Sequence, residues 1–360
     1  MGKTVTTEFL PAFAGRRVMV TGHTGFKGSW LAFLLKEIGA EVLGYALPAE
    51  LPVSHFAALG LAKSIRHVEA DVRDGARLAE TMMAFQPEFV FHLAAQALVR
   101  PSYADPKTTF ETNVMGSVNL LDAVRQCESV RSLVYITSDK CYENLEWVWG
   151  YRENDRLGGH DPYSASKAAA EIAFSAYARS FFAHRPELGA ATARAGNVIG
   201  GGDWAVDRIV PDCIRAIGVG KPVVLRNPQA TRPWQHVLEP LAGYLLLAAR
   251  LREQPMTYAG AWNFGPPSSE VRTVLEVAER IVARFGRGSI VIEPDGTKQH
   301  EANLLQLNCD KAHQLLGWRP RWNVEQTLAA TADWYKAVMD GTEASTVTHQ
   351  QLRDYFPELK

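Results

Sequence analysis

The stretch VMVTGHTGFKGSWLAFLLKEI at residues 18–38 decides the expected fold. It begins with the apolar run 18–20, which predicts a strand, and then turns through Gly22, Gly25 and Gly28. Apolar side chains then recur at helical spacing, at Phe26, Trp30, Leu34 and Ile38. A strand, a glycine-rich turn and an amphipathic helix predict a phosphate-binding device, because glycines let the backbone approach a pyrophosphate and the helix N-terminus attracts the anion.

The spacing of these glycines is G-x-x-G-x-x-G, which differs from the commonest dinucleotide fingerprint, G-x-G-x-x-G. Glycines at a helix start also serve plain turns, so the loop alone leaves both interpretations open. The sequence on either side of the loop must decide between them.

Strand and helix patterns alternate after this loop. Strands are expected at 41–46, 65–70, 88–93, 132–136 and 190–194, and helices at 77–85, along the face Phe110, Val114, Val118 and Leu121, and at 163–182. Repeated βαβ units predict an α/β fold, a Rossmann-type doubly wound parallel sheet with helices on both faces. We expect residues 1–196 to form the nucleotide-binding domain.

Short elements separated by glycine and proline follow, with helices expected at 238–251, 273–285, 310–316 and 324–339. We therefore expect a smaller mixed α/β substrate domain at 197–360. Its boundary is approximate, because the chain could cross back to the main sheet within 230–265, through a strand near Trp262.

Composition excludes several classes of partner. The net charge of −1 gives no electrostatic case for binding nucleic acid or an anionic membrane. No run approaches the roughly 18 apolar residues of a membrane span. The four cysteines include no C-x-x-C pair, which suits a reducing compartment, so we expect a cytoplasmic protein.

The motif YSASK places Tyr163 and Lys167 on one face of a helix. A free tyrosine has a pKa near ~10 and is a weak base at neutral pH. A neighbouring lysine charge favours phenolate, so we expect it to lower the pKa of Tyr163. Tyr163 would then take a proton from a sugar hydroxyl as hydride leaves the same carbon. A surface Tyr–Lys pair is the alternative, which the glycine-rich turn upstream disfavours.

Thr137, Ser138, Asp139 and Lys140 stand directly after the strand expected at 132–136. A hydroxyl, a carboxylate and an amine in succession are costly to bury at the carboxyl end of a strand without a purpose. Ligands of parallel α/β sheets bind at that edge. We expect a catalytic segment here, in preference to an ordinary polar loop.

The loop TGHTGFKG at 21–28, SDK at 138–140 and YSASK at 163–167 together resemble the extended short-chain dehydrogenase/reductase family, in its nucleotide-sugar branch. Longer segments are similar to the CDP-glucose 4,6-dehydratases of that branch. These segments are 22–31, 142–171, 194–212, 231–245 and 300–322. The resemblance therefore covers most of the chain.

The resemblance implies a reaction. NAD would accept hydride from C4 of CDP-glucose and return it to C6 after water has been lost, which gives a CDP-4-keto-6-deoxy sugar. The catalytic residues it implies are Ser138, Asp139, Lys140, Tyr163 and Lys167. In this mechanism Ser138 supports Tyr163 by hydrogen bonding, and Asp139 is the general acid that protonates the C6 oxygen.

The resemblance also implies binding residues. Those for the cofactor are Gly22, His23, Gly25, Phe26, Lys27, Gly28, Asp71, Val72, Leu93, Ala94, Ala95, Tyr163 and Lys167. Those for the substrate are Gln96, Ser138, Asn197, Arg208 and Arg232. Arginine suits bidentate recognition of phosphate, and Gln96 is expected to face the sugar. Asp71 would contact adenine, although a residue near a helix N-cap is an equal alternative.

Lys140 has two possible roles. Relatives that act on dTDP-glucose carry a glutamate there, which can act as the C5 base. A lysine with a pKa near ~10.4 is charged at pH 7 and cannot take a proton. Either burial lowers its pKa, or it stabilises the developing enolate as a cation.

The choice of NAD over NADP follows the resemblance. NAD-specific folds usually carry an acid at the end of the second strand, but residues 44–47 are Gly-Tyr-Ala-Leu. Glu50 lies in a later proline-flanked loop, and His23 and Lys27 could approach the adenosine phosphates, which leaves NADP open on the residues alone. We expect NAD because a cofactor regenerated in place matches the reaction.

The remaining expectations concern metals, other functions and assembly. His300 and Glu301 have no further ligands at suitable spacing, so no metal is expected. The alternatives are a nucleotide-sugar 4-epimerase, a dehydratase for another nucleotide sugar, and a non-catalytic NAD-binding regulator. The epimerase needs no acid–base couple, and the regulator predicts a degraded catalytic set. We expect a homodimer or homotetramer, and a role in deoxysugar and O-antigen lipopolysaccharide synthesis.

Overall fold

The computed structural model of the chain describes residues 8–49, 53–293 and 304–359. At its centre is a seven-stranded sheet whose neighbouring strands all run parallel. The strands are β1 (Arg17–Thr21), β2 (Glu41–Ala46), β3 (Arg66–Glu69), β4 (Phe89–His92), β5 (Ser132–Ile136), β6 (Gly189–Arg194) and β11 (Gly260–Asn263). Their order is β11-β6-β5-β4-β1-β2-β3, which confirms the predicted Rossmann-type sheet.

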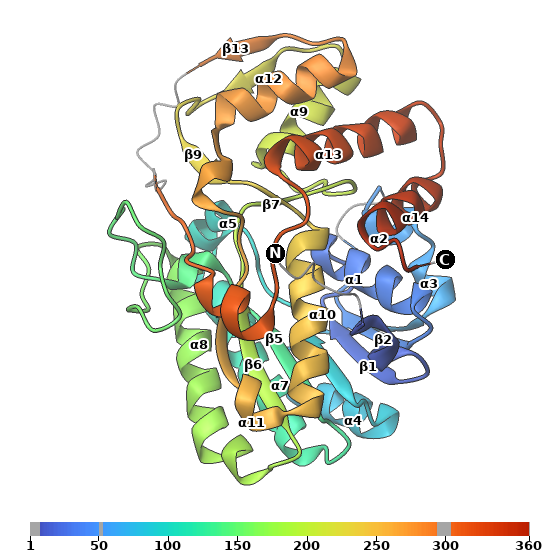
Figure 1. The fold of residues 1–360 in the computed structure, drawn as a ribbon, viewed down its shortest axis with the longest axis vertical. Coiled ribbons are helices and arrows are strands. Elements are labelled where there is room, and N and C mark those ends of the chain that lie inside the picture. The colour runs from blue at the N-terminus through green and yellow to red at the C-terminus, as the bar shows by residue number, and fades with distance from the viewer. Residues whose placement is uncertain (1–7, 50–52, 294–303, 360) are drawn as a thin grey trace.

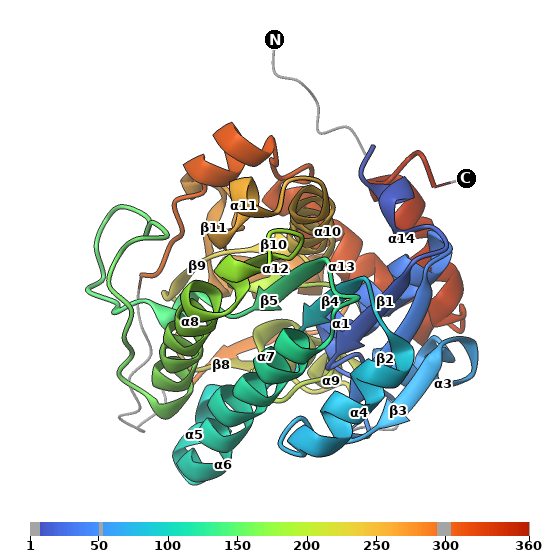
Figure 2. The same ribbon diagram turned by 90° about the horizontal axis from the view of Figure 1, so that it is seen from below.

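Alternating side chains of the strands build a core on each face of the sheet. In β1, Val18 and Val20 join one buried cluster and Met19 joins the other, as expected for a period of two. Helices α1 (Phe26–Glu37) and α10 (Leu238–Glu253) pack with the first cluster. Helices α4 (Gly75–Phe85), α7 (Gly116–Gln126) and α8 (Pro162–Ser180) cover the other face (Figures 1 and 2).

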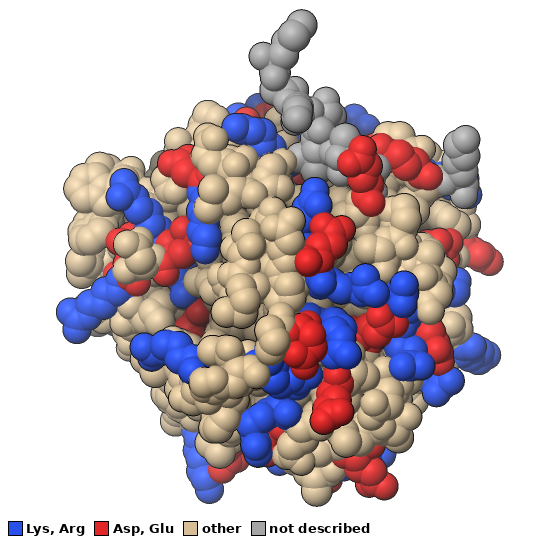
Figure 3. Space-filling view, turned by 60° about the horizontal axis from the view of Figure 1, so that its bottom comes forward, with Lys and Arg blue, Asp and Glu red and all other residues tan. Residues whose placement is uncertain are grey.

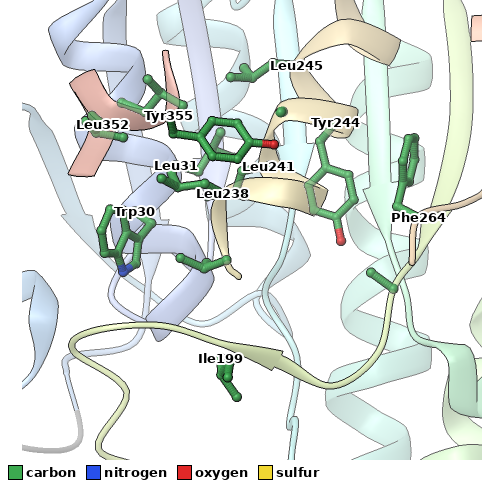
Figure 4. Close-up of a cluster of buried hydrophobic side chains, with 14 of the residues drawn as sticks. Trp30, Leu31, Ile199, Leu238, Leu241, Tyr244, Leu245, Phe264, Leu352 and Tyr355 are labelled. Carbon is green, nitrogen blue, oxygen red and sulfur yellow. The ribbon is translucent and has the colours of Figure 1, made fainter. Parts of the chain in front are cut away.

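Helix α1 is more deeply buried than the amphipathic pattern predicted, since every residue from 28 to 35 is buried. The cause is the C-terminal part of the chain: α10 and α14 (Ala344–Tyr355) both pack against it (Figure 4). His55 ties these elements together, because its two ring nitrogens pair with Ser29 of α1 at 2.9 Å and Thr348 of α14 at 3.1 Å.

The helix expected around 110–121 has a different buried face from the one predicted. It is divided into α6 (Pro106–Phe110), a π-helical turn (Glu111–Met115) and α7. The π turn adds a residue to the helical repeat and so rotates the faces. Phe110 is exposed, Val114 and Val118 are half-buried, and Asn113 and Ser117 are buried instead.

The C-terminal half adds a smaller group of helices above the sheet, α9 (Ile209–Gly218), α12 (Val274–Phe285) and α13 (Val324–Met339), seen at the top of Figure 1. Three two-stranded sheets accompany them. Their strands are β7 (Val198–Ile199) with β10 (Gln235–His236), β8 (Val223–Leu225) with β13 (Ile290–Ile292), and β9 (Thr231–Pro233) with β12 (Val271–Thr273). Strand β11 then returns to the main sheet beside β6, which confirms the predicted crossing.

The described chain also contains short α-helices. They are α2 (His55–Ala58), α3 (Leu61–Ser64), α5 (Val99–Ala104) and α11 (Pro255–Tyr258). Within the described ranges, no helix has the length and apolar character needed to cross a bilayer. On the face shown in Figure 3, acidic and basic side chains are interspersed, as the near-zero net charge predicts.

Candidate active site

The glycine loop between β1 and α1 is shaped by close backbone approaches. Gly22 has a φ of +75°, and a Cβ there would lie 2.6 Å from the Ala94 amide nitrogen. A Cβ at Gly28 would lie 2.1 Å from the Gly22 carbonyl oxygen. Gly25 caps α1 and has no neighbour nearer than 3.4 Å on its Cβ side. The first N–H groups of α1 have no partner within the helix, and together with the closely folded glycine loop they fit the pyrophosphate of a dinucleotide such as NAD.

The segment after β5 forms a short hydrogen-bonded turn. Ser138 Oγ accepts a hydrogen bond from the Lys140 backbone N–H at 3.2 Å and donates one to Asp139 Oδ1 at 2.9 Å. Ser138 and Asp139 are buried, and Lys140 is half-buried. Asp139 packs directly on Gly196, where a Cβ would lie 1.8 Å from the carboxylate. The backbone of Gly196 thus leaves the space that the carboxylate fills.

Helix α8 brings Tyr163 to this turn. The helix is capped by Asp161, which accepts a hydrogen bond from the Ser164 N–H at 2.9 Å. The Ser138 hydroxyl acts on the Tyr163 phenol and lowers its pKa, and the Asp139 carboxylate raises it. The structure thus brings together Ser138, Asp139 and Tyr163, which are distant in sequence.

The expectation that Lys167 lowers the pKa of Tyr163 is wrong for this structure. Burial raises the pKa of Tyr163 to about 12, and Asp139 adds to the increase, while the Ser138 hydrogen bond only partly opposes it. Lys167 is itself buried, and desolvation lowers its pKa to about 8, assisted by the nearby charge of Lys27. Tyr163 is therefore a neutral phenol at neutral pH in the resting protein, and not a phenolate.

A buried ion pair behind these residues was not predicted. Arg194 of β6 donates two hydrogen bonds to Glu171 of α8, at 2.9 and 2.8 Å. Thr137 and Thr192 donate to the same carboxylate at 2.5 and 2.9 Å. The pair therefore fixes the residue just before Ser138 to the helix that carries Tyr163 and Lys167. The spacing of Glu171 four residues after Lys167 was the available sequence signal.

Lys27 and Arg208 lie near the reacting groups. Desolvation lowers the pKa of Lys27 to about 8, with Arg208 lowering it further and Asp139 opposing. Arg208 forms a 2.8 Å ion pair with Asp203 and is close enough to Tyr163 to stabilise its phenolate. Both cations therefore contribute positive potential where an anionic substrate would be held.

Two predicted binding side chains are engaged elsewhere. His23 is buried against Gly44 and its Nε2 pairs with His67 Nδ1 at 2.7 Å, so its ring packs beside β2 and β3 instead of approaching a phosphate. The side chain of Gln96 bonds both backbone groups of Leu98, at 2.5 and 2.9 Å, instead of facing the sugar. The sequence could not predict these positions, because the partners of both residues depend on tertiary contacts or loop conformation.

The remaining cofactor candidates surround the carboxyl ends of β3 and β4. Asp71 lines an open hollow of about 500 Å³ together with Arg73, Asp74, Glu111 and Met115. Burial raises the pKa of Asp71, but the hydrogen bonds that Arg73 donates outweigh burial and hold this pKa below its usual value. The N-cap of α4 is Asp74, and Asp71, three residues earlier, accepts a hydrogen bond from the Arg73 backbone N–H at 2.9 Å, so the alternative of a residue near a helix N-cap also fits Asp71. Val72 packs against Gly116, and Ala94 packs against Gly22. Leu93 directly follows β4, and Ala95 is the residue before Gln96. Phe26 is the first residue of α1 and lies beside Gly200.

The other substrate candidates lie in the C-terminal half. Asn197 follows Gly196 with a left-handed φ of +52°, and its carbonyl accepts from the Gln235 N–H at 3.2 Å. Arg232 lies in β9 and is half-buried. Glu50, His300 and Glu301 lie outside the described residues. Among the residues that the structure describes, no group of three or more histidine, cysteine, aspartate or glutamate side chains could hold a metal ion.

Comparison with known proteins agrees with this geometry. Residues 19–331 match the family model described as GDP-mannose 4,6 dehydratase. A CDP-glucose 4,6-dehydratase of Salmonella typhimurium is 46% identical over 346 residues, which is 95% of this chain and 96% of that protein. The structure of a UDP-glucose 4-epimerase from Thermus thermophilus, in complex with NAD, aligns with a TM-score of 0.75 at 27% identity, covering 89% of this chain and 99% of that one.

An epimerase from Methanothermobacter thermautotrophicus has the same fold, with a TM-score of 0.79 at 23% identity over 92% of this chain and 96% of that one. The fold is thus shared by epimerases and dehydratases. The match to the family model and the 46% identical relative both extend over most of the sequence. The chain therefore belongs to the GDP-mannose 4,6 dehydratase family, within the nucleotide-sugar branch of the extended short-chain dehydrogenase/reductases.

Proposed function

We propose that this chain is a lyase that dehydrates CDP-glucose to CDP-4-dehydro-6-deoxy-glucose and water, with NAD as a catalytic cofactor. The observation that carries the proposal is the 46% identity to a CDP-glucose 4,6-dehydratase over nearly the full length of both chains. The proposed catalytic residues Ser138, Asp139, Lys140, Tyr163 and Lys167 are all present and lie in two adjacent segments, the turn after β5 and the first turns of α8.

The glycine loop and the start of α1 would hold NAD, together with the hollow at Asp71 for its adenine. Bound NAD supplies the acceptor and donor for the hydride that leaves C4 and arrives at C6. Tyr163 takes the proton of the 4-OH group in its phenolate form, which Ser138 and Arg208 favour, and Asp139 protonates the C6 oxygen so that it leaves as water. Lys140 acts at C5, either as base or as a cation beside the enolate. Arg208, Arg232 and Asn197 hold the sugar diphosphate.

A nucleotide-sugar 4-epimerase is the competing function, because solved epimerases share the fold. An epimerase oxidises C4 and reduces it again, and needs no acid at the C6 oxygen. Asp139 is buried, accepts a hydrogen bond from Ser138, and is close enough to Tyr163 to affect its pKa, which suits a proton donor near the proposed base. This placement favours dehydration.

The finer assignments belong to the same proposal. We infer a nucleotide-binding domain at 1–196 and a substrate domain at 197–360, with α10 and β11 crossing back to the first. Four buried free cysteines suit a reducing cytoplasm. A homodimer or homotetramer would cover the exposed apolar side chains just before α7 and on or after α8, and the 4-keto-6-deoxy product would supply deoxysugars for an O-antigen polysaccharide.

Mass spectrometry of the products tests the function. The protein and NAD are incubated separately with CDP-, dTDP-, GDP- and UDP-linked sugars, among them CDP-glucose. We expect the loss of one water from CDP-glucose alone. Water loss from a different nucleotide sugar would contradict the choice of base, and an isomer of unchanged mass would indicate epimerisation.

A further inference from the structure

The guanidinium of Arg208 is held by one carboxylate in this structure. Arg208 is half-buried at the start of α9, and on the proposed function it binds the sugar diphosphate. Its Nη1 donates to Asp203 Oδ2 at 2.8 Å, and this carboxylate is the only acceptor for the Arg208 side chain among the residues that the structure describes. An arginine side chain has five N–H donors in a planar fork. Four of them therefore remain available for a ligand.

Asp203 is itself fixed by hydrogen bonds that leave one carboxylate oxygen for Arg208. The residue is buried, with 5% of its surface exposed. Its Oδ1 accepts a hydrogen bond from the Ala205 N–H at 3.1 Å, and its Oδ2 pairs with Arg208. The backbone carbonyl of Asp203 accepts a hydrogen bond from the Tyr335 hydroxyl of α13 at 2.5 Å. Both the backbone and the side chain of Asp203 are therefore held in place by groups other than Arg208.

The glycine run at 200–202 fixes the path of the backbone into Asp203. Trp30 of α1 donates a hydrogen bond from its Nε1 to the Gly201 carbonyl at 2.9 Å. A Cβ at Gly201 would lie 2.0 Å from the ring of Trp334 in α13, so no residue with a side chain fits there without a shift of the loop. Both tryptophans are buried. The loop that leads to Asp203 is thus packed between α1 and α13, in the interior of the molecule.

We infer, on the basis of the proposed function, that Asp203 is a positioning residue for the substrate, because it orients Arg208 so that the unpaired donors of the guanidinium face the sugar diphosphate. Arginine binds phosphate through two parallel N–H groups, so the orientation of its fork matters as well as its charge. An arginine that is already held by an ion pair also loses less side-chain freedom when the ligand binds. The ion pair thus prepares the site for a diphosphate before the substrate arrives.

The position of Arg208 relative to the proposed base agrees with this role. Arg208 is close enough to Tyr163 to lower the pKa of the phenol, and close enough to Lys27 to lower the pKa of that ammonium group. A diphosphate bound by Arg208 would therefore place the adjoining sugar near Tyr163.

The negative charge of Asp203 allows orientation to be distinguished from simple electrostatics. A carboxylate repels a nearby diphosphate, so an Asp203 that acted only through its charge would weaken binding. Its replacement by asparagine would then strengthen the binding of CDP. Orientation predicts the opposite, because asparagine keeps the oxygen that accepts from Ala205 but presents an NH2 donor to Arg208. The two explanations therefore predict changes of opposite sign.

Equilibrium binding of CDP and of cytidine to the NAD-loaded protein, measured by isothermal titration calorimetry, tests the role of Asp203. Cytidine lacks the phosphates and so reports the binding of base and ribose alone. The variants are Asp203→Asn, Arg208→Ala and the double variant. Asp333→Asn is the matched control, because Asp333 of α13 forms an ion pair with Arg284 at 2.6 Å in which both side chains are about half exposed. Circular dichroism and retained NAD establish that the variants are folded.

We expect Asp203→Asn to weaken the binding of CDP by about 10- to 100-fold, the usual range for the loss of a hydrogen bond to a charged group. The binding of cytidine should not change. The double variant should bind CDP no more weakly than Arg208→Ala alone, because Asp203 acts through Arg208. In steady-state dehydration of CDP-glucose, the KM of Asp203→Asn should rise by a larger factor than kcat falls. Asp333→Asn should leave every value at the wild-type level.

Equal or tighter binding of CDP by Asp203→Asn would overturn the positioning role, since Asp203 would then be no more than a neighbouring charge. A double variant whose loss is the product of the two single losses would overturn it too. If Asp203→Asn does not fold, Tyr335→Phe makes the test with every charge kept, and CDP binding as tight as in the wild type would overturn the role. In each case dehydration of CDP-glucose by the wild type would leave the proposed function standing. Failure of the wild type to bind CDP more tightly than cytidine would overturn both.

Discussion

At the residue scale, the position of the proposed acid, Asp139, depends on Gly196 having no side chain. Asp139 packs on Gly196 so closely that a Cβ would lie 1.8 Å from its carboxylate oxygen. The sequence of residues 137–140 could predict a functional acid after β5, since polar residues there are costly to bury without a purpose. It could not predict Gly196, because that contact joins the ends of two neighbouring strands, β5 and β6.

We predict that Gly196→Ala lowers the rate of CDP-glucose dehydration by about 100-fold or more, because the carboxylate must move from the C6 oxygen. The measurement is the steady-state rate, with the melting temperature as a check on folding. Gly218→Ala is the matched control, since a Cβ there would be no nearer than 3.4 Å to any side chain. Equal rates for the Gly196→Ala variant and the wild type would contradict the proposed place of Asp139.

Contacts of single residues also show where the structure differs from the sequence-based expectations. His23 and Gln96 stand in segments that were expected to bind ligands, and their side chains were expected to do so too. His23 instead pairs with His67 of β3, and Gln96 bonds Leu98 and Thr109. Tyr163 was expected to have a lowered pKa from a local Tyr–Lys spacing, whereas burial by the rest of the chain decides its direction.

At the element scale, α8 positions the chemistry by presenting three side chains at intervals of four residues. Tyr163, Lys167 and Glu171 lie on one face, and Glu171 is anchored to Arg194 of β6. Most elements of the sheet were predictable, because runs of apolar residues and glycine turns are local signals. The π turn at Glu111–Met115 was not, since it changes the buried face without changing the helical pattern.

We predict that Glu171→Gln lowers the free energy of unfolding by about 3–5 kcal/mol, because it leaves the buried Arg194 without a counter-charge. Urea unfolding measures this effect. Glu128→Gln at an exposed position gives the control, with no change beyond about 0.5 kcal/mol. A loss below 1 kcal/mol in Glu171→Gln would show that the pair is replaceable and does not fix the catalytic segment.

Glu239 of α10 joins the C-terminal segment to the core and gives a second prediction at this scale. Burial raises its pKa from the ordinary 4.5 to about 7, against hydrogen bonds from Tyr355 at 2.6 Å, Trp322 at 2.8 Å and Arg321 at 3.0 Å. The folded protein therefore holds a proton that the unfolded chain releases. The stability this group contributes is complete below pH 4.5 and is lost as the pH rises to about 7.

We therefore predict that the free energy of unfolding of the wild type, relative to Glu239→Gln, falls by about 3 kcal/mol between pH 4.5 and pH 8. Urea unfolding of both proteins over this range measures the difference. Glutamine cannot ionise, so the comparison isolates this carboxyl from other titrating groups. A difference that stays constant with pH, or that grows in favour of the wild type, would contradict the assignment.

At the scale of the whole molecule, the C-terminal half completes the fold by covering α1 and returning β11 to the sheet. Crossing back was predictable from a strand pattern near Trp262, but α14 and its contacts with α1 were not, because no motif links residues so far apart in sequence. Exposed apolar side chains remain on α7 and α8 or beside them, among them Phe110, Met115, Ile172 and Phe181. They agree with the proposed pairing of two copies.

We predict that the wild type is a dimer or larger in solution scattering, and that Ile172→Glu shifts it towards a monomer. Ile172 is 60% exposed in the single chain, so the charge would cost little there but would be buried in a pairing of α8 helices. Val219→Glu, at an apolar position that is 69% exposed after α9, is the control and should not change the mass. A wild-type monomer would rule out this assembly.

The most direct test of the central claim follows one hydrogen atom. CDP-glucose labelled with deuterium at C4 is converted by the protein and its NAD, and the product is analysed by nuclear magnetic resonance and mass spectrometry. The account predicts CDP-4-dehydro-6-deoxy-glucose with the deuterium at C6. Deuterium that remains at C4 of an isomerised sugar would contradict dehydration, and water loss without deuterium at C6 would contradict the return of the hydride within the site.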